Sequence, residues 1–116
     1  MSYQQSYGAA AGSGPVEIVT ETGTSRTLAL TDAFKYIRTT NGSAVTITVP
    51  PNSSVAFETG IQIDVFQDGA GQVTFAEGSG VTINRSYGLK IAVQNQAATL
   101  VKVDTNEWDL IGALTA

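Results

Sequence analysis

Residues 61–114 read IQIDVFQDGAGQVTFAEGSGVTINRSYGLKIAVQNQAATLVKVDTNEWDLIGAL, and this stretch decides the fold class. Apolar and polar residues alternate over short runs, as at Ile61, Ile63 and Val65, and a turn containing glycine or asparagine ends most runs. A period of two places every second side chain on one face of a strand. Because no segment keeps a helical period beyond one turn, the stretch predicts an all-β fold.

The same pattern extends upstream. Val45, Ile47 and Val49 alternate with threonines, the turn Asn41-Gly42 precedes them, and Pro50-Pro51 ends the run because proline cannot donate to a ladder. Eight to ten strands at spacings of about 8–12 residues are typical of an antiparallel β-sandwich or a jelly roll. The alternating apolar residues predicted to fill the core are Val45, Ile47, Ile63, Val65, Phe75, Leu89, Ile91, Leu100 and Val103.

A three-residue phrase, Val-Thr-Ile or Val-Thr-Phe, begins at Val45, Val73 and Val81. Its spacing is irregular, so it does not by itself predict a solenoid repeat.

The length of 116 residues suits one domain, which buries about two-thirds of its surface. Residues 1–15 are uncharged and rich in Gly, Ala and Ser, a composition that cannot bury enough apolar surface to order itself. We therefore expect a flexible N-terminal arm over residues 1–15 and a single β-sandwich domain over residues 16–116. The arm is either a disordered terminus or a tether whose anchors, Tyr3 and Tyr7, order against a neighbour.

Composition excludes several functions. The chain has no Cys and no His, which removes disulfides, thiol nucleophiles and the usual zinc ligands. Six cationic and ten acidic residues give a net charge of −4, which disfavours nucleic acids and anionic membranes as partners. No apolar run approaches about 18 residues, and the N-terminus has no signal-peptide pattern. We expect no cofactor and no metal.

The sequence contains candidate residues for three kinds of site. The carboxylate pairs Asp64 with Asp68 and Glu107 with Asp109 have the parity of an acid and base pair, but acids beside Gly and Asn are ordinary turn residues. A calcium site has three candidate ligands: Asp68, Asp104 and Asn106. A sugar-stacking platform has three candidate aromatics: Trp108, Tyr36 and Tyr87. In each case the structural explanation is preferred, and we expect that the protein is not an enzyme.

Four segments together resemble a known domain. They are Thr46-Ile47-Thr48-Val49-Pro50 followed by Gly60, Val65 to Phe75, Gly80-Val81-Thr82-Ile83-Asn84, and Ala98 to Val103 leading to Trp108-Asp109-Leu110-Ile111-Gly112. The series resembles a small β-domain of tailed-bacteriophage virion proteins, which occurs in capsid decoration (cement) proteins and in modules of tail or head fibres. The resemblance covers about three-quarters of the chain, from Arg26 to Leu114.

The resemblance implies a structural virion protein that works by packing. The expected role is capsid decoration: a homotrimer, made in the host cytoplasm, that binds the major capsid protein on the exterior of the virion and stabilises the shell. The arm would contact the capsid or a neighbour through Tyr3 and Tyr7. Subunit contacts are expected at four residues of the C-terminal segment: Trp108, Leu110, Ile111 and Leu114. The alternative is a fibre module that binds a host receptor or a carbohydrate.

Overall fold

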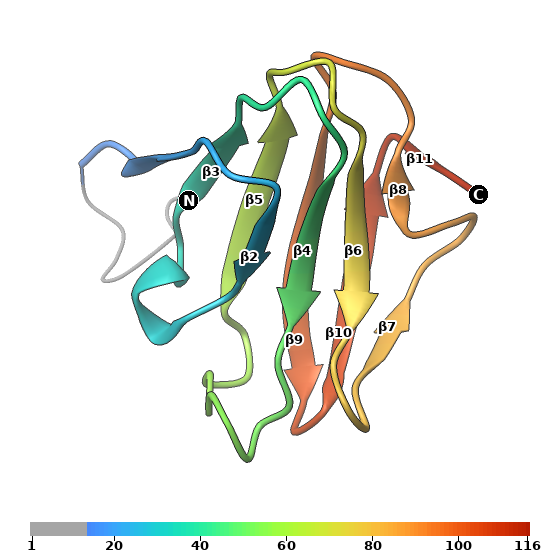
Figure 1. The fold of residues 1–116 in the computed structure, drawn as a ribbon. Coiled ribbons are helices and arrows are strands. Elements are labelled where there is room, and N and C mark those ends of the chain that lie inside the picture. Colours follow the sequence, from blue (N-terminus) through green and yellow to red (C-terminus); the bar gives the residue numbers. More distant parts are fainter. Residues whose placement is uncertain (1–13) are drawn as a thin grey trace.

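The structure, a computed structural model, describes residues 14–116. It is almost all β, with 47% of the described residues in strands and 3% in helix, so the expected all-β sandwich is confirmed. The elements are β1 (Ile18–Glu21), β2 (Ser25–Thr27), the 3-10 turn η1 (Leu30–Asp32), β3 (Tyr36–Thr39), β4 (Val45–Val49), β5 (Gln62–Gln67), β6 (Val73–Glu77), β7 (Thr82–Asn84), β8 (Lys90–Ile91), β9 (Ala97–Asp104), β10 (Glu107–Gly112) and β11 (Leu114–Thr115) (Figure 1).

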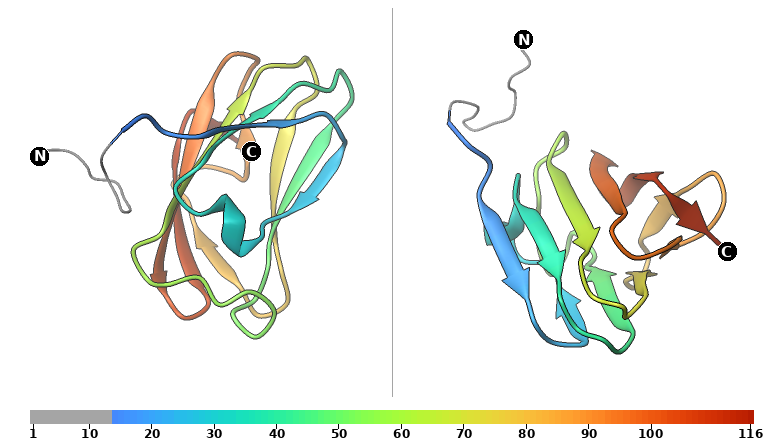
Figure 2. Two further views of the ribbon diagram at one scale, coloured as in Figure 1. Left: turned by 90° about the vertical axis from the view of Figure 1, so that its left-hand side faces the viewer. Right: turned by 90° about the horizontal axis from the view of Figure 1, so that it is seen from above.

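Two sheets face each other. One has six strands in the order β1-β3-β5-β9-β10-β7, and the other has five in the order β11-β8-β6-β4-β2. Figure 2 shows the layers edge-on, with β9 and β10 on one side and β4 and β6 on the other. No helix in the described part of the chain is long and apolar enough to cross a membrane.

The strand directions correct one expectation. Five of the nine strand pairings are parallel, and only β5–β9, β9–β10, β6–β8 and β8–β11 are antiparallel. The sheets are therefore mixed and not antiparallel throughout. From β1 to β6 the chain changes sheet after every strand, so consecutive strands of one sheet run in the same direction. The glycine-containing turns after β3, β5 and β6 are therefore arches between the sheets.

Residues 36–49 and 64–77 form two stacked coils of this kind. Ile37 lies beside Val65 in one sheet and Val45 beside Val73 in the other, each pair 28 residues apart. The phrase Val-Thr-Ile of β4 therefore stacks in register on Val-Thr-Phe of β6. The third occurrence, at Val81, does not join this stack, because it leads into β7 in the opposite sheet.

The core lies between the sheets, as expected for most of the predicted residues. Seven of them are buried: Val45, Ile47, Ile63, Val65, Phe75, Ile91 and Leu100. Leu89 is half-buried against this core. Val103 is 39% exposed, which corrects its prediction. The inward residues of β9 are Ala98, Leu100 and Lys102, so Val103 has the outward parity.

Candidate functional site

The outer faces of the two sheets differ in chemistry. Outward positions of the five-stranded sheet are mostly small and hydroxylated: Ser25, Thr27, Thr46, Thr48, Thr74, Ala76, Lys90 and Thr115. Those of the six-stranded sheet include a set of large apolar side chains: Ile18, Tyr36, Phe66, Val101, Val103 and Ile111. Ile18, Val103 and Ile111 are exposed, and Tyr36, Phe66 and Val101 are half-buried. Large apolar side chains at the surface of one face are typical of a partner-binding surface. We therefore treat the outer face of the six-stranded sheet, the β1–β7 face, as the candidate site.

An aromatic and charged cluster lies on the β1–β7 face. The rings of Tyr36 on β3 and Phe66 on β5 are stacked, with centroids 6.1 Å apart and planes at 25°. The guanidinium of Arg38 lies 5.2 Å from the centroid of Phe66, a cation–π contact of about 0.5–1 kcal/mol at such a site. Arg38 also donates to Asp68 at 2.5 Å. The Nε of Arg38 is buried and has no hydrogen-bond partner among residues 14–116.

Asp64 lies next to this cluster and is already bonded. Its carboxylate accepts a hydrogen bond of 2.6 Å from the hydroxyl of Thr99 on the neighbouring strand. Asp64 and Asp68 thus have different partners, Thr99 and Arg38. They supply fixed acceptors on a flat apolar surface, which suits recognition.

The second carboxylate pair lies at the far side of the same face. The side-chain amide of Asn84 on β7 donates to Glu107 at 2.8 Å and to Asp109 at 2.9 Å. Parallel pairing of β7 with β10 sets this geometry. The structure therefore brings Glu107 and Asp109 together, but around an amide that satisfies both, and the pair forms an acidic rim.

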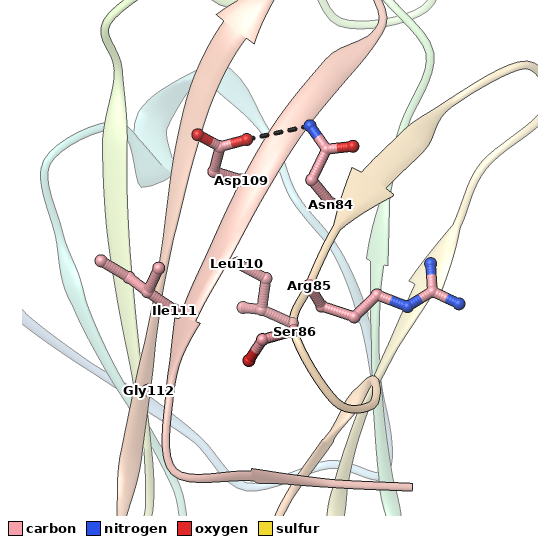
Figure 3. Close-up of a pocket in the computed structure, with 7 residues that line it drawn as sticks. All are labelled: Asn84, Arg85, Ser86, Asp109, Leu110, Ile111 and Gly112. Carbon is pink, nitrogen blue, oxygen red and sulfur yellow. Dashed lines mark hydrogen bonds between the residues drawn. The ribbon is translucent and has the colours of Figure 1, made fainter.

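A hollow of about 350 Å³ opens beside this rim. Its lining residues come from the end of β7 and from β10: Asn84, Arg85, Ser86, Asp109, Leu110, Ile111 and Gly112 (Figure 3). Figure 3 shows Arg85 extending away from the hollow, and its guanidinium lies 3.4 Å from Glu77. The wall of the hollow is thus mixed: Asn84, Ser86 and Asp109 are polar, and Ile111 is its exposed apolar side chain.

The four residues expected at subunit contacts have different environments. Trp108 and Leu110 are 1% and 2% exposed, and Trp108 packs edge-on against Phe57 at 5.4 Å. These two expectations are corrected, because Trp108 and Leu110 are inward residues of β10 that fill the chain's own core. Leu114 is half-buried on the core in β11. Ile111 is 60% exposed and is available for a contact. The predicted anchors Tyr3 and Tyr7 lie outside the described residues.

The remaining candidates from the sequence are not assembled into sites. No group of three metal-binding side chains of the types His, Cys, Asp and Glu occurs within residues 14–116. Burial of Trp108 removes it from any sugar platform, and Tyr87 is on a separate loop with 71% exposure. Tyr36 does lie on a platform, but its partner is Phe66. Phe66 was not predicted as a site residue, because it lies on the outward face of β5 and the alternating pattern of that strand indicated only its inward core residues, Ile63 and Val65.

A buried lysine lies at the opposite end of the sandwich. Lys102 is 2% exposed, and its ammonium group donates to the side-chain oxygen of Asn52 at 2.6 Å and to the carbonyl of Phe57 at 2.7 Å. Both acceptors belong to the loop between β4 and β5, so Lys102 fastens that loop to β9. Burial lowers the pKa of Lys102 below its ordinary value of 10.5.

We expect Lys102 to make the free energy of unfolding increase with pH in the alkaline range. Between its lowered folded pKa and 10.5, the unfolded chain binds more protons than the folded one, so the free energy of unfolding rises with pH. Urea unfolding from pH 8 to about pH 10.5 measures this rise. In Lys102→Met the Lys102 contribution should disappear, whereas Lys90→Met, on the outer face, should keep it. An unchanged pH slope in Lys102→Met would contradict the assignment.

Comparison with known proteins gives no relative. No protein-family model matches the chain, and neither a curated protein nor a solved structure matches it. The functional argument therefore depends on the residues and on the geometry described above.

Proposed function

We propose that this chain is a structural virion protein of a tailed bacteriophage, a capsid decoration protein that binds the head shell as a trimer and stabilises it. The observation that carries the proposal is the contrast between the two outer faces. A bland hydroxylated face suits solvent, and the apolar β1–β7 face suits a permanent contact. The resemblance of residues 26–114 to virion β-domains supplies the kind of assembly.

The proposed mechanism is additive burial. Each copy contributes a rigid sandwich, and a trimer that holds the shell at three points at once is retained far longer than a single copy. The N-terminal arm, through Tyr3 and Tyr7, adds a contact to the capsid or to a neighbouring trimer.

Two measurements test this function. Analytical ultracentrifugation should give the mass of three chains, and the protein should co-sediment with decoration-free heads of the phage that encodes it. Removing residues 1–14 should weaken head binding at least several-fold without changing the trimer. Equal head affinity with and without residues 1–14 would contradict the role of the arm. A monomer that ignores heads would overturn the decoration role.

A second function has its own supporting observation. The paired rings of Tyr36 and Phe66, flanked by Arg38 and Asp64, match what a pyranose requires: an apolar surface for its C–H groups and charged partners for its hydroxyls. A fibre module that binds carbohydrate would use this platform. Binding to a glycan array that Phe66→Ala abolishes, together with no head binding, would favour the fibre module over decoration.

A further inference from the structure

We infer that the free edge of β1 is a strand-docking site and that residues 2–7 of a second copy add to it as a further strand. The docking rests on the arm contact in the proposed function and places that contact on a copy in a neighbouring trimer. Three features carry it: the backbone groups of β1, the sequence of residues 2–7, and the length of chain before β1.

The backbone of β1 has an open edge. The carbonyls of Glu17 and Glu21 accept hydrogen bonds of 3.0 Å from the β3 side, so the odd-numbered residues of β1 bond to β3. Backbone groups alternate in direction along a strand, and therefore the N–H and C=O groups of Ile18 and Thr20 point away from β3. β1 is the last strand of its sheet, and no hydrogen bond from residues 14–116 reaches these groups. Two donors and two acceptors thus form a template for an added strand.

The opposite edge of the same sheet is blocked by side chains. Thr82 of β7 donates to the carbonyl of Asn106 at 2.9 Å, so Ile83 carries the outward backbone groups of β7. The N–H of Ile83 donates to the carboxylate of Glu77 at 2.7 Å, and its C=O accepts from Arg85 at 2.9 Å. Side chains that satisfy an edge in this way prevent strand addition. Within residues 14–116 the β1 edge has no such block, which makes it the edge of this sheet that is open to a partner.

The two faces of β1 match the two faces of the proposed strand. Residues 2–7 read SYQQSY, without glycine, proline or charge, and in a strand Tyr3 and Tyr7 share one face while both serines lie on the other. The outward face of β1 carries Ile18, which is 61% exposed. The inward face carries Glu21, which is paired with Arg26. Docked with its tyrosines outward, the strand covers Ile18 and sets its serines toward the ion pair.

The length of the chain before β1 favours a second copy as the source of the strand. Residues 14–17 are exposed and lead away from both layers (Figure 2). The thirteen residues before them span up to about 43 Å when extended, which exceeds the longest dimension of the protein, 34 Å. Residues 2–7 can therefore reach the β1 edge of a neighbouring molecule without a reversal of the chain.

Amide hydrogen exchange, followed by NMR on the full-length chain, tests this docking. In concentrated wild-type protein the amides of Ile18 and Thr20 should exchange about ten-fold more slowly, or slower still, than in Gln4→Pro/Gln5→Pro. The two prolines remove a backbone donor from each edge of the segment, so neither edge can pair fully. The amide of Val19 faces β3 and should stay slow in both proteins, which shows that β1 remains folded.

A matched control and a mixing experiment complete the test. Ala9→Pro/Ala10→Pro places two prolines outside residues 2–7 and should keep the wild-type protection. A labelled Gln4→Pro/Gln5→Pro chain mixed with an excess of unlabelled wild-type chain should regain protection at Ile18, because the added strand comes from the other copy.

Three outcomes would overturn the inference. Exchange at Ile18 that is as fast in the wild type as in Gln4→Pro/Gln5→Pro means that the edge stays open. Protection in the wild type that the mixture does not restore means that the chain's own arm occupies the edge. Loss of protection in Ala9→Pro/Ala10→Pro as well means that residues 2–7 are not the strand.

Head binding is measured separately on the wild-type protein. Absence of docking in a protein that still forms trimers on heads removes only this inference, whereas docking in a protein that ignores heads removes only the decoration role.

Discussion

Replacing Gly71 with alanine is expected to destabilise the protein by about 3 kcal/mol or more. Gly71 lies in the arch between β5 and β6, which stacks on the arch between β3 and β4. A Cβ at Gly71 would lie 1.8 Å from the backbone oxygen of Ser43, an impossible approach. Two backbone hydrogen bonds hold the two arches together and prevent Ser43 from moving away. The amide of Val45 donates to the carbonyl of Gln72 at 3.0 Å, and the amide of Gly71 donates to the carbonyl of Asn41 at 3.0 Å.

The arch between β3 and β4 contains a glycine, Gly42, that supplies a matched control. A Cβ at Gly42 would meet nothing within 4 Å, so Gly42→Ala should change the free energy of unfolding by no more than about 0.5 kcal/mol. Urea unfolding of both variants measures the difference. Equal stability of Gly71→Ala and Gly42→Ala would show that the arches are not stacked as described.

These arches also show why the strand pairing was not predictable. The sequence predicts a turn at Asn41-Gly42, but a glycine turn between two alternating strands looks the same whether the chain returns within one sheet or crosses to the other. The difference is in long-range pairing, such as Val45 with Val73. Local alternation reports which residues face inward, and it predicted the core from Val45 to Leu100 for that reason.

The candidate face was less predictable than the core. Ile111 was expected at a contact and is exposed, but Trp108 and Leu110 were assigned to the same contact although their inward parity buries them. Phe66 and Arg38 carried no signal of their own in the sequence. Their significance comes from the parallel pairing of β3 with β5, which places Arg38 beside Phe66. The local alternation of apolar and polar residues does not reveal that two strands 28 residues apart pair in parallel.

A network of charged side chains closes the sandwich at the edge where β1 and β2 are the outermost strands of the two sheets. Arg26 of β2 pairs in register with the buried Ile47 and therefore points between the sheets. It donates to both carboxylate oxygens of Asp32, at 2.6 and 3.3 Å, and to Glu21 at 2.8 Å. Figure 2 shows η1, which contains Asp32, over this end of the two layers.

Arg26→Met is expected to cost about 3–5 kcal/mol of unfolding free energy, because it leaves the 2%-exposed Asp32 carboxylate without a cation. Adding Asp32→Asn should recover part of this loss, since it removes the stranded charge. Arg85→Met breaks the more exposed pair with Glu77 and should cost at most about 1 kcal/mol. Urea unfolding at pH 7 separates these results. A loss for Arg26→Met as small as that for Arg85→Met would mean that the network does not hold this end of the sandwich.

The same network predicts an acid dependence with a definite sign. The hydrogen bond from Arg26, and then that from the backbone of Gly23, hold the pKa of Glu21 below its ordinary value of 4.5. A carboxylate with a lowered folded pKa contributes stability that is complete above 4.5 and is lost as the pH falls through the folded value. Glu21→Gln should therefore be less stable than the wild type at pH 7 and should lose less on acidification below pH 4.5. In Arg26→Met the free energy of unfolding should likewise fall less steeply below pH 4.5, because this variant removes the main cause of the lowered pKa of Glu21. If the free energy of unfolding fell equally steeply below pH 4.5 in the wild type and in both variants, this role of Glu21 would be contradicted. Burial without the hydrogen bonds would raise the pKa of Glu21 and would not produce this acid dependence.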